Sequence, residues 1–136
     1  MTFSATANRR LNLAVTYANL SAALSILKPD GKTWVTTSVS NGSGVDTAPA
    51  PTTGTYTIII DPGATVTGNL TLTLSAEIAG SITIGGSSVS VSVARPGQKA
   101  RLLFSGTTGQ RVSLTATSVT GSNDVRLLRP DGSLIS

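Results

Sequence analysis

The chain has no cysteine, no histidine, few charged residues and few aromatic residues. Without cysteine there is no disulfide framework and no thiolate chemistry. Without histidine it lacks the usual acid–base group of neutral pH and a common zinc ligand. Charged residues make up 12% and aromatic residues 4%, while serine, threonine and glycine occupy most polar positions. This composition is more typical of β-sandwich modules than of helical enzymes.

Long apolar runs are also missing. No stretch approaches the roughly 18 consecutive apolar residues of a membrane span, and residues 1–10 lack the apolar core of a signal peptide. We therefore expect no membrane span, and we expect any export signal to lie on a longer parent chain. An apolar fraction of 39% is enough to bury the core of one domain or of two small ones.

The net charge of +4 is concentrated in residues 81–136, which hold six cationic and two acidic residues. A basic surface attracts nucleic acid or anionic glycans. No set of stacking aromatics accompanies the charge, so nucleic acid is not expected as a partner and a solvated strand face remains the alternative. The candidate contact surface consists of these six cations and the single tryptophan: Arg95, Lys99, Arg101, Arg111, Arg126, Arg129 and Trp34.

A short motif occurs twice, as ILKPDGKTW at residues 26–34 and as LLRPDGSLI at residues 127–135. The step from Asp30 to Asp131 is 101 residues, and the same step pairs Phe3 with Phe104 over residues 3–35 and 104–136. Internal repeats identify the unit that folds. The sequence therefore predicts an out-of-phase tandem repeat of about 101 residues. Residues 1–80 would be the C-terminal part of one repeat and residues 81–136 the N-terminal part of the next.

Alternation of apolar and polar residues predicts strands and no long helix. Residues 11–28 contain enough alanine and leucine to suit a helix, but the repeated segment alternates at residues 112–116, so we predict strands at 11–16 and 23–27. Further strands are predicted near residues 56–60, 70–74, 81–84, 89–93, 100–104 and 125–128, and residues 36–54 are predicted to be an exposed loop. The spacing predicts an all-β chain forming an antiparallel, jelly-roll-like β-sandwich.

The repeated Pro-Asp-Gly is predicted to be a turn. Proline fixes φ, aspartate bonds to nearby backbone, and glycine accepts a positive φ. Catalysis by Asp30 or Asp131 would need a neighbouring histidine, cysteine, carboxylate or metal ligand set, and none is adjacent. Paired carboxylates of the glycosidase kind remain a minor alternative among six acidic residues. We expect no catalytic residue, no resident metal and no cofactor.

Calcium is the more plausible ion at these turns. It needs only oxygen ligands, which the Asn123-Asp124 and Asp61 turns offer. Plain capping of the turns by these side chains is the preferred interpretation. Trp34 follows the first Pro-Asp-Gly turn and is either a residue at the edge of the core or a platform for a sugar.

Two segments of the chain would follow one another within a single repeat: GQRVSLTATSVTGSNDVRLLRPDGS and TGTYTIIIDPGATVTGNLTLTLS. Together they resemble the pre-peptidase C-terminal domain of bacterial secreted and surface proteins. The shared features are Gly109 before a strand, the Pro130-Asp131-Gly132 turn, Tyr56 after Gly54-Thr55, and a closing strand at 70–74. The resemblance implies a compact noncatalytic sandwich appended to hydrolases or repeated in surface chains. The family's Asp-Leu-Tyr-Leu run is replaced here by Asp124-Val125-Arg126-Leu127, so no family ligand or calcium site is carried over.

These observations together predict a spacer or adhesion module of a bacterial extracellular or cell-surface protein. Its expected partners are the other modules of the parent chain, with a polysaccharide or matrix protein as the alternative ligand. Unpaired strand edges are expected because the repeat is out of phase. Either residues 89–104 fold back to supply the strands missing before Phe3, completing the same sandwich, or chains exchange segments in a strand-exchanged homo-oligomer.

Overall fold

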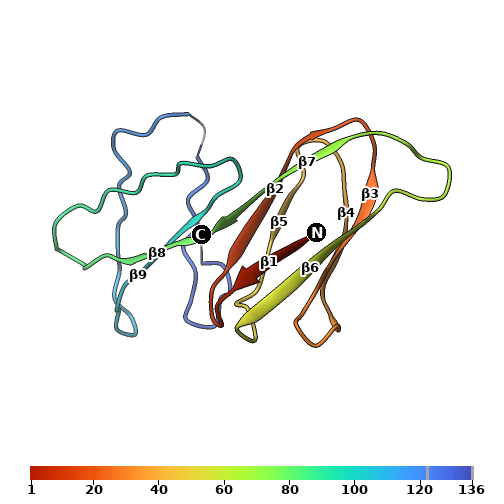
Figure 1. The fold of residues 1–136 in the computed structure, drawn as a ribbon. Coiled ribbons are helices and arrows are strands. Elements are labelled where there is room, and N and C mark those ends of the chain that lie inside the picture. The colour runs from red at the N-terminus through yellow and green to blue at the C-terminus, as the bar shows by residue number, and fades with distance from the viewer. Residues whose placement is uncertain (122, 136) are drawn as a thin grey trace. The chain divides into compact units, whose positions relative to one another are not determined.

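The computed structural model describes residues 1–121 and 123–135, and over these residues it contains nine β-strands and no helix (Figure 1). The prediction of an all-β chain is confirmed. Over the same residues, no helix has the length and apolarity needed to cross a bilayer. The strands are β1 (Thr2–Ala5), β2 (Leu11–Ala18), β3 (Ala22–Leu27), β4 (Thr33–Val39), β5 (Gly44–Asp46), β6 (Gly54–Asp61), β7 (Leu70–Ala76), β8 (Ile78–Ser81) and β9 (Ala100–Leu103).

The chain divides into two compact units, Met1–Ser105 and Gly106–Ser136, and all nine strands lie in the first. The first unit spans the 101-residue step that separates Phe3 from Phe104 in the sequence. The division at residue 80, which separates the end of one sequence repeat from the start of the next, stays a prediction.

Two antiparallel sheets make up most of the first unit. One has the strand order β1-β6-β3-β4 and the other the order β5-β2-β7. Buried side chains from both sheets join in one hydrophobic cluster. The largest apolar members with almost no exposure are Leu24, Ile26, Val39 and Tyr56 of the first sheet and Leu13 and Val15 of the second.

Residues 11–28 form β2 and β3, although their composition would also suit a helix. This confirms the strands predicted at 11–16 and 23–27. β2 is the central strand of its sheet and is buried at five consecutive residues, Leu11 to Val15. One face of β2 contributes Leu13 to the core, and Gly97 packs against Ala14. The hydrogen bonds of β2 to β5 and β7, together with the packing of Gly97 on Ala14, outweigh the helix propensity of alanine and leucine.

Residues 36–54 are more ordered than the predicted exposed loop. β4 runs to Val39, β5 pairs with β2, and Val39, Val45 and Ala50 are buried. The prediction was wrong because β5 is a three-residue strand whose hydrogen-bonding partner lies in β2. A strand this short shows no periodicity of its own.

Residues 89–104 do not supply strands beside Phe3, which corrects that expectation. β1 pairs with β6, placing Phe3 opposite Tyr56, and β9 pairs in parallel with β8. Val89, Val91 and Val93 alternate with serine but form no strand and are 41–52% exposed. Alternation permits a strand, but a strand forms only where a neighbour accepts its hydrogen bonds.

The second unit contains no named strand among its described residues, and its one β-bridge joins Leu128 to Leu134. The strands predicted at 112–116 and 125–128 are therefore not formed. The Pro-Asp-Gly turn is formed in both units. Gly31 and Gly132 have φ values of +79° and +86°, which glycine adopts readily.

Candidate functional site

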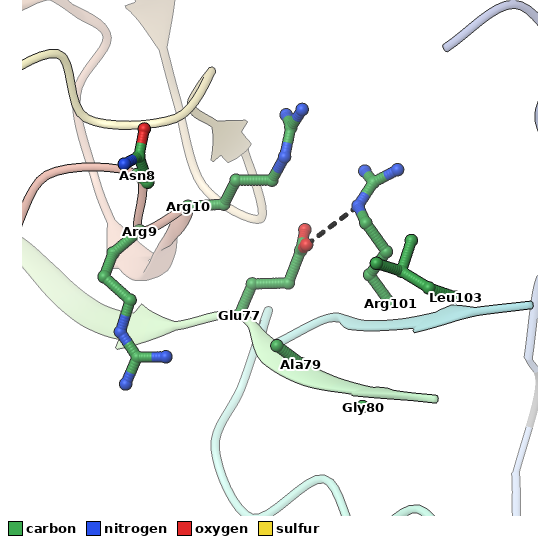
Figure 2. A pocket seen from close by; sticks show the side chains of 8 residues that line it. All are labelled: Asn8, Arg9, Arg10, Glu77, Ala79, Gly80, Arg101 and Leu103. Atoms are coloured by element: carbon green, nitrogen blue, oxygen red, sulfur yellow. Dashed lines mark hydrogen bonds and ion pairs between the residues drawn. The ribbon is translucent and has the colours of Figure 1, made fainter. Parts of the chain in front are cut away.

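A small cavity of about 170 Å³ in the first unit is the strongest candidate for a contact site (Figure 2). It gathers three arginines and one glutamate from segments far apart in the sequence. The residues lining it are Asn8, Arg9, Arg10, Glu77, Ala79, Gly80, Arg101 and Leu103.

The loop between β1 and β2 places the first two arginines. Asn8 has a φ of +68°, and its backbone N–H donates to the carbonyl of Ala50 at 2.8 Å. The N–H of Ala50 donates in turn to the carbonyl of Arg9 at 2.8 Å, so the loop is held on both sides. The N–H of Glu77 then donates to the carbonyl of Arg10 at 2.9 Å, which brings the end of β7 beside the loop.

The third arginine comes from β9. Arg101 Nε donates to Glu77 Oε1 at 2.9 Å, and the Glu77 side chain is only 11% exposed. Arg10 Nη1 reaches the carbonyl of Thr47 at 3.5 Å, a long contact. In Figure 2 the side chains of Arg10 and Arg101 stand on either side of the Glu77 carboxylate, and Arg9 extends in another direction.

The cavity carries an excess of positive charge, because three arginines and one glutamate line it. Guanidinium groups bind carboxylate and sulfate oxygens through paired N–H donors. Arg101 already uses Nε on Glu77, whereas Arg9 is exposed to solvent. The arrangement is therefore suited to hold a small anionic group.

The structure distributes the predicted contact residues over both units. Arg95 Nη1 donates to the carbonyl of Leu74 at 3.2 Å, and Lys99 pairs with Asp46. These residues and Arg101 belong to the first unit, and Arg111, Arg126 and Arg129 belong to the second.

The two bonded cations of the second unit have local partners. Arg126 Nε donates to Asp124 Oδ2 at 2.7 Å, and Arg129 Nη1 donates to the carbonyl of Leu134 at 2.8 Å. Arg111 is exposed.

Trp34 lies at the edge of the core. It is half-buried, and its ring centroid lies 5.1 Å from that of Tyr56, which in turn stacks on Phe3 at 5.5 Å. This position agrees with the interpretation of Trp34 as a boundary core residue.

Sequence reasoning missed Arg9 and Arg10. Residues 1–80 are neutral overall, so their two adjacent arginines did not stand out. The available signal was two consecutive cations directly before the strand predicted at 11–16. Their nearness to Arg101 depends on tertiary pairing of β8 with β9.

The acidic residues at the turns bond to nearby groups. Asp61 Oδ1 accepts from the backbone N–H of Gly63 at 3.1 Å, and Asp124 accepts from Arg126. The Asp61 contact is the side-chain-to-backbone capping expected at that turn, whereas Asp124 forms an ion pair with the Arg126 side chain. Over residues 1–121 and 123–135, no group of three or more acidic side chains could hold a metal ion.

The two Pro-Asp-Gly carboxylates share one geometry. Asp30 Oδ1 accepts from the N–H of Lys32 at 3.0 Å, and Asp131 Oδ1 accepts from the N–H of Ser133 at 2.8 Å. The Lys32 N–H lowers the pKa of Asp30 below its ordinary value of 3.8. The Ser133 hydroxyl, followed by the Ser133 N–H, lowers the pKa of Asp131 in the same direction. Both carboxylates are therefore acceptors within a turn.

No family model matches the chain, and comparison with curated proteins and with solved structures finds no match either.

Proposed function

We propose that the chain is a noncatalytic β-sandwich module, jelly-roll-like in its connections, that serves as a spacer or adhesion unit of a bacterial extracellular or cell-surface protein. Its partners are then the other modules of the parent chain. The resemblance to the pre-peptidase C-terminal domain points to the same role.

One observation carries the proposal: the turn geometry recurs at a step of 101 residues. The N–H of Lys28 donates to the carbonyl of Lys32 at 2.8 Å, and that of Arg129 donates to Ser133 at 2.8 Å. The N–H groups of Gly31 and Gly132 donate to the residue three positions earlier, each at 2.9 Å. A module that repeats in one chain is suited to set distance, because each copy adds a fixed length.

The sandwich assignment is supported by the shared core of the two sheets. Leu13 of β2 and Leu24 of β3 are at most 1% exposed and belong to the same cluster, although their strands lie in different sheets. Two antiparallel sheets that bury one common cluster are the arrangement found in sandwich modules.

Parallel assays for turnover and for binding test the noncatalytic role. The intact chain would be incubated with glycoside, ester and peptide substrates, and its Glu77→Gln variant would serve as the control, since Glu77 is the acid that lines the cavity. The proposal predicts no turnover by either protein. Turnover by the unsubstituted chain would overturn it, and loss of that turnover in Glu77→Gln would place the activity at the cavity.

The cavity favours a second candidate, a binding module for acidic polysaccharide or matrix. Three guanidinium groups at one opening suit sulfate or uronate groups, and such binding weakens with added salt. Immobilised heparin-like and uronate polymers would be probed with the chain and with Arg9→Ala/Arg10→Ala.

The matched control is Arg126→Ala, which removes an exposed, paired arginine outside this cavity. Loss of binding in the double variant alone supports this candidate. Equal binding by all three proteins excludes it.

A further inference from the structure

Residues 104–136 carry the apolar pattern of a buried segment, but most of their large apolar side chains are exposed. Leu13 of β2 is 1% exposed, and its counterpart Leu114 is 60% exposed. Leu24 of β3 is 0% exposed, and its counterpart Val125 is 57% exposed. The second unit therefore has a sequence suited to a core that its own described residues do not form.

The first unit shows what covers this pattern when it is buried. β2 pairs with β5 and β7, and β3 pairs with β4 and β6. Apart from the first residues of β4, all of these neighbours lie within residues 36–103. In the first unit, residues 36–103 are thus the segment that covers β2 and β3.

The local geometry for docking is already present in the second unit. Asn8, at the turn before β2, has a φ of +68°, and its counterpart Gly109 has a φ of +80°. The N–H of Arg9 donates to Thr6 at 3.2 Å, and the N–H of Gln110 donates to Thr107 at 3.1 Å. The turns at both ends of the predicted strand pair are therefore formed, and only the strands lack neighbours.

We propose that residues 104–136 are the docking half of a second module and that their partner is a second copy of residues 36–103. The proposal rests on the modular repeat proposed above. The residues 36–103 of the first unit are not available, because β2 and β3 already occupy their pairing edges. Strand addition supplies backbone hydrogen bonds, and the exposed leucine and valine side chains supply the apolar contact.

The test extends the intact chain after residue 136 with a second copy of residues 36–103. Amide hydrogen exchange would be followed at Leu114 and Val125. In the extended chain we expect exchange at both amides to slow by at least about 100-fold, as for strands that open only in cooperative unfolding. Size-exclusion chromatography with light scattering then shows whether the copy docks within one chain or between two.

Two controls separate docking from nonspecific collapse. An extension of the same composition in scrambled order should leave Leu114 and Val125 unprotected. Leu114→Asp should remove the gained protection in the extended chain and leave the unextended chain unchanged, because Leu114 is exposed there.

The proposal is overturned if the native extension gives no protection while Leu13 stays protected, or if the scrambled extension protects equally. Either result leaves the noncatalytic role intact, because that role is tested by turnover in the unextended chain. Turnover would overturn that role without bearing on docking.

Discussion

Lys99 and Asn12 are joined by a hydrogen bond that spans 87 residues of sequence: the Lys99 backbone N–H donates to Asn12 Oδ1 at 2.9 Å. Asn12 is 1% exposed, and its Nδ2 donates to Asp46 Oδ1 at 3.0 Å. One buried amide thus links β2, β5 and the segment before β9. Around this bond, Gly97 packs against Ala14 and Gln98 Nε2 donates to the carbonyl of Ala76 at 3.0 Å.

Asn12→Ala should destabilise the first unit by about 1–3 kcal/mol, because it removes both hydrogen bonds of a buried amide, one from the Lys99 N–H and one to the Asp46 carboxylate. Urea denaturation measures the change in the free energy of unfolding. Asn69→Ala, at an exposed asparagine, is the matched control and should change it by less than about 0.5 kcal/mol. Equal effects of the two substitutions would contradict the role assigned to Asn12.

Gly97→Ala should detach the segment that covers β2. A Cβ at this position would lie 2.6 Å from the Cβ of Ala14, and Gly97 has a φ of +72°. Gly85 has the same φ of +72° and open space around it, so Gly85→Ala measures the backbone strain alone, about 1 kcal/mol.

Hydrogen exchange at Lys99 reports the detachment directly. It should become faster in Gly97→Ala and stay unchanged in Gly85→Ala. Unchanged exchange at Lys99 in both variants would show that the close approach of Gly97 does not hold the segment.

Tyr56→Phe should cost about 1 kcal/mol of stability. The Tyr56 hydroxyl donates to the carbonyl of Thr52 at 2.7 Å, and the residue is fully buried between Phe3 and Trp34. Tyr17→Phe removes a hydroxyl from a side chain that is 51% exposed and should be neutral in thermal unfolding. A neutral Tyr56→Phe would show that the hydroxyl does not anchor the loop before β6.

The strands with the clearest alternation could be predicted from the sequence, and those fixed by distant neighbours could not. β6 and β7 are evident from their own residues, and β2 and β3 became evident from the repeat. The short strand β5 depends on pairing with β2, and β8 finds β9 across an irregular segment. Residues 89–93 alternate equally well but have no neighbouring strand, so they stay irregular.

The candidate site was predictable only in part, for a related reason. Arg101 stood out in a basic half of the sequence, but the two other arginines of the cavity come from the other end of the first unit. Arg9 and Arg10 reach the cavity because Ala50 and Glu77 bond to the backbone of their loop. Such contacts depend on tertiary folding and leave no local pattern.

The repeated carboxylates should respond differently to substitution of the residue two positions later. Ser133→Ala removes the hydroxyl that contributes most to the lowered pKa of Asp131, so that pKa should rise toward 3.8. Lys32→Ala keeps the backbone N–H that contributes most at Asp30, so the pKa of Asp30 should stay below 3.8. Carboxyl NMR titration measures both. A return of Asp30 to 3.8 in Lys32→Ala would contradict this assignment.

The direction of the shifts also fixes the pH dependence of the turns. Because the folded-state pKa of Asp30 and Asp131 is lowered, their stabilising effect is fully present above 3.8 and is lost as pH falls through the folded-state pKa. The stabilisation that the two aspartates give their turns should therefore be lost only below pH 3.8. In Asp30→Asn, the pH-dependent loss at the turn of the first unit should disappear.

Native-state hydrogen exchange on the intact chain tests the central claim most directly, since the claim is that one repeated pattern is buried in one copy and uncovered in the other. The account predicts strong protection at Leu13 and Leu24 and little protection at Leu114 and Val125. Equal protection at the two sets of amides would contradict it.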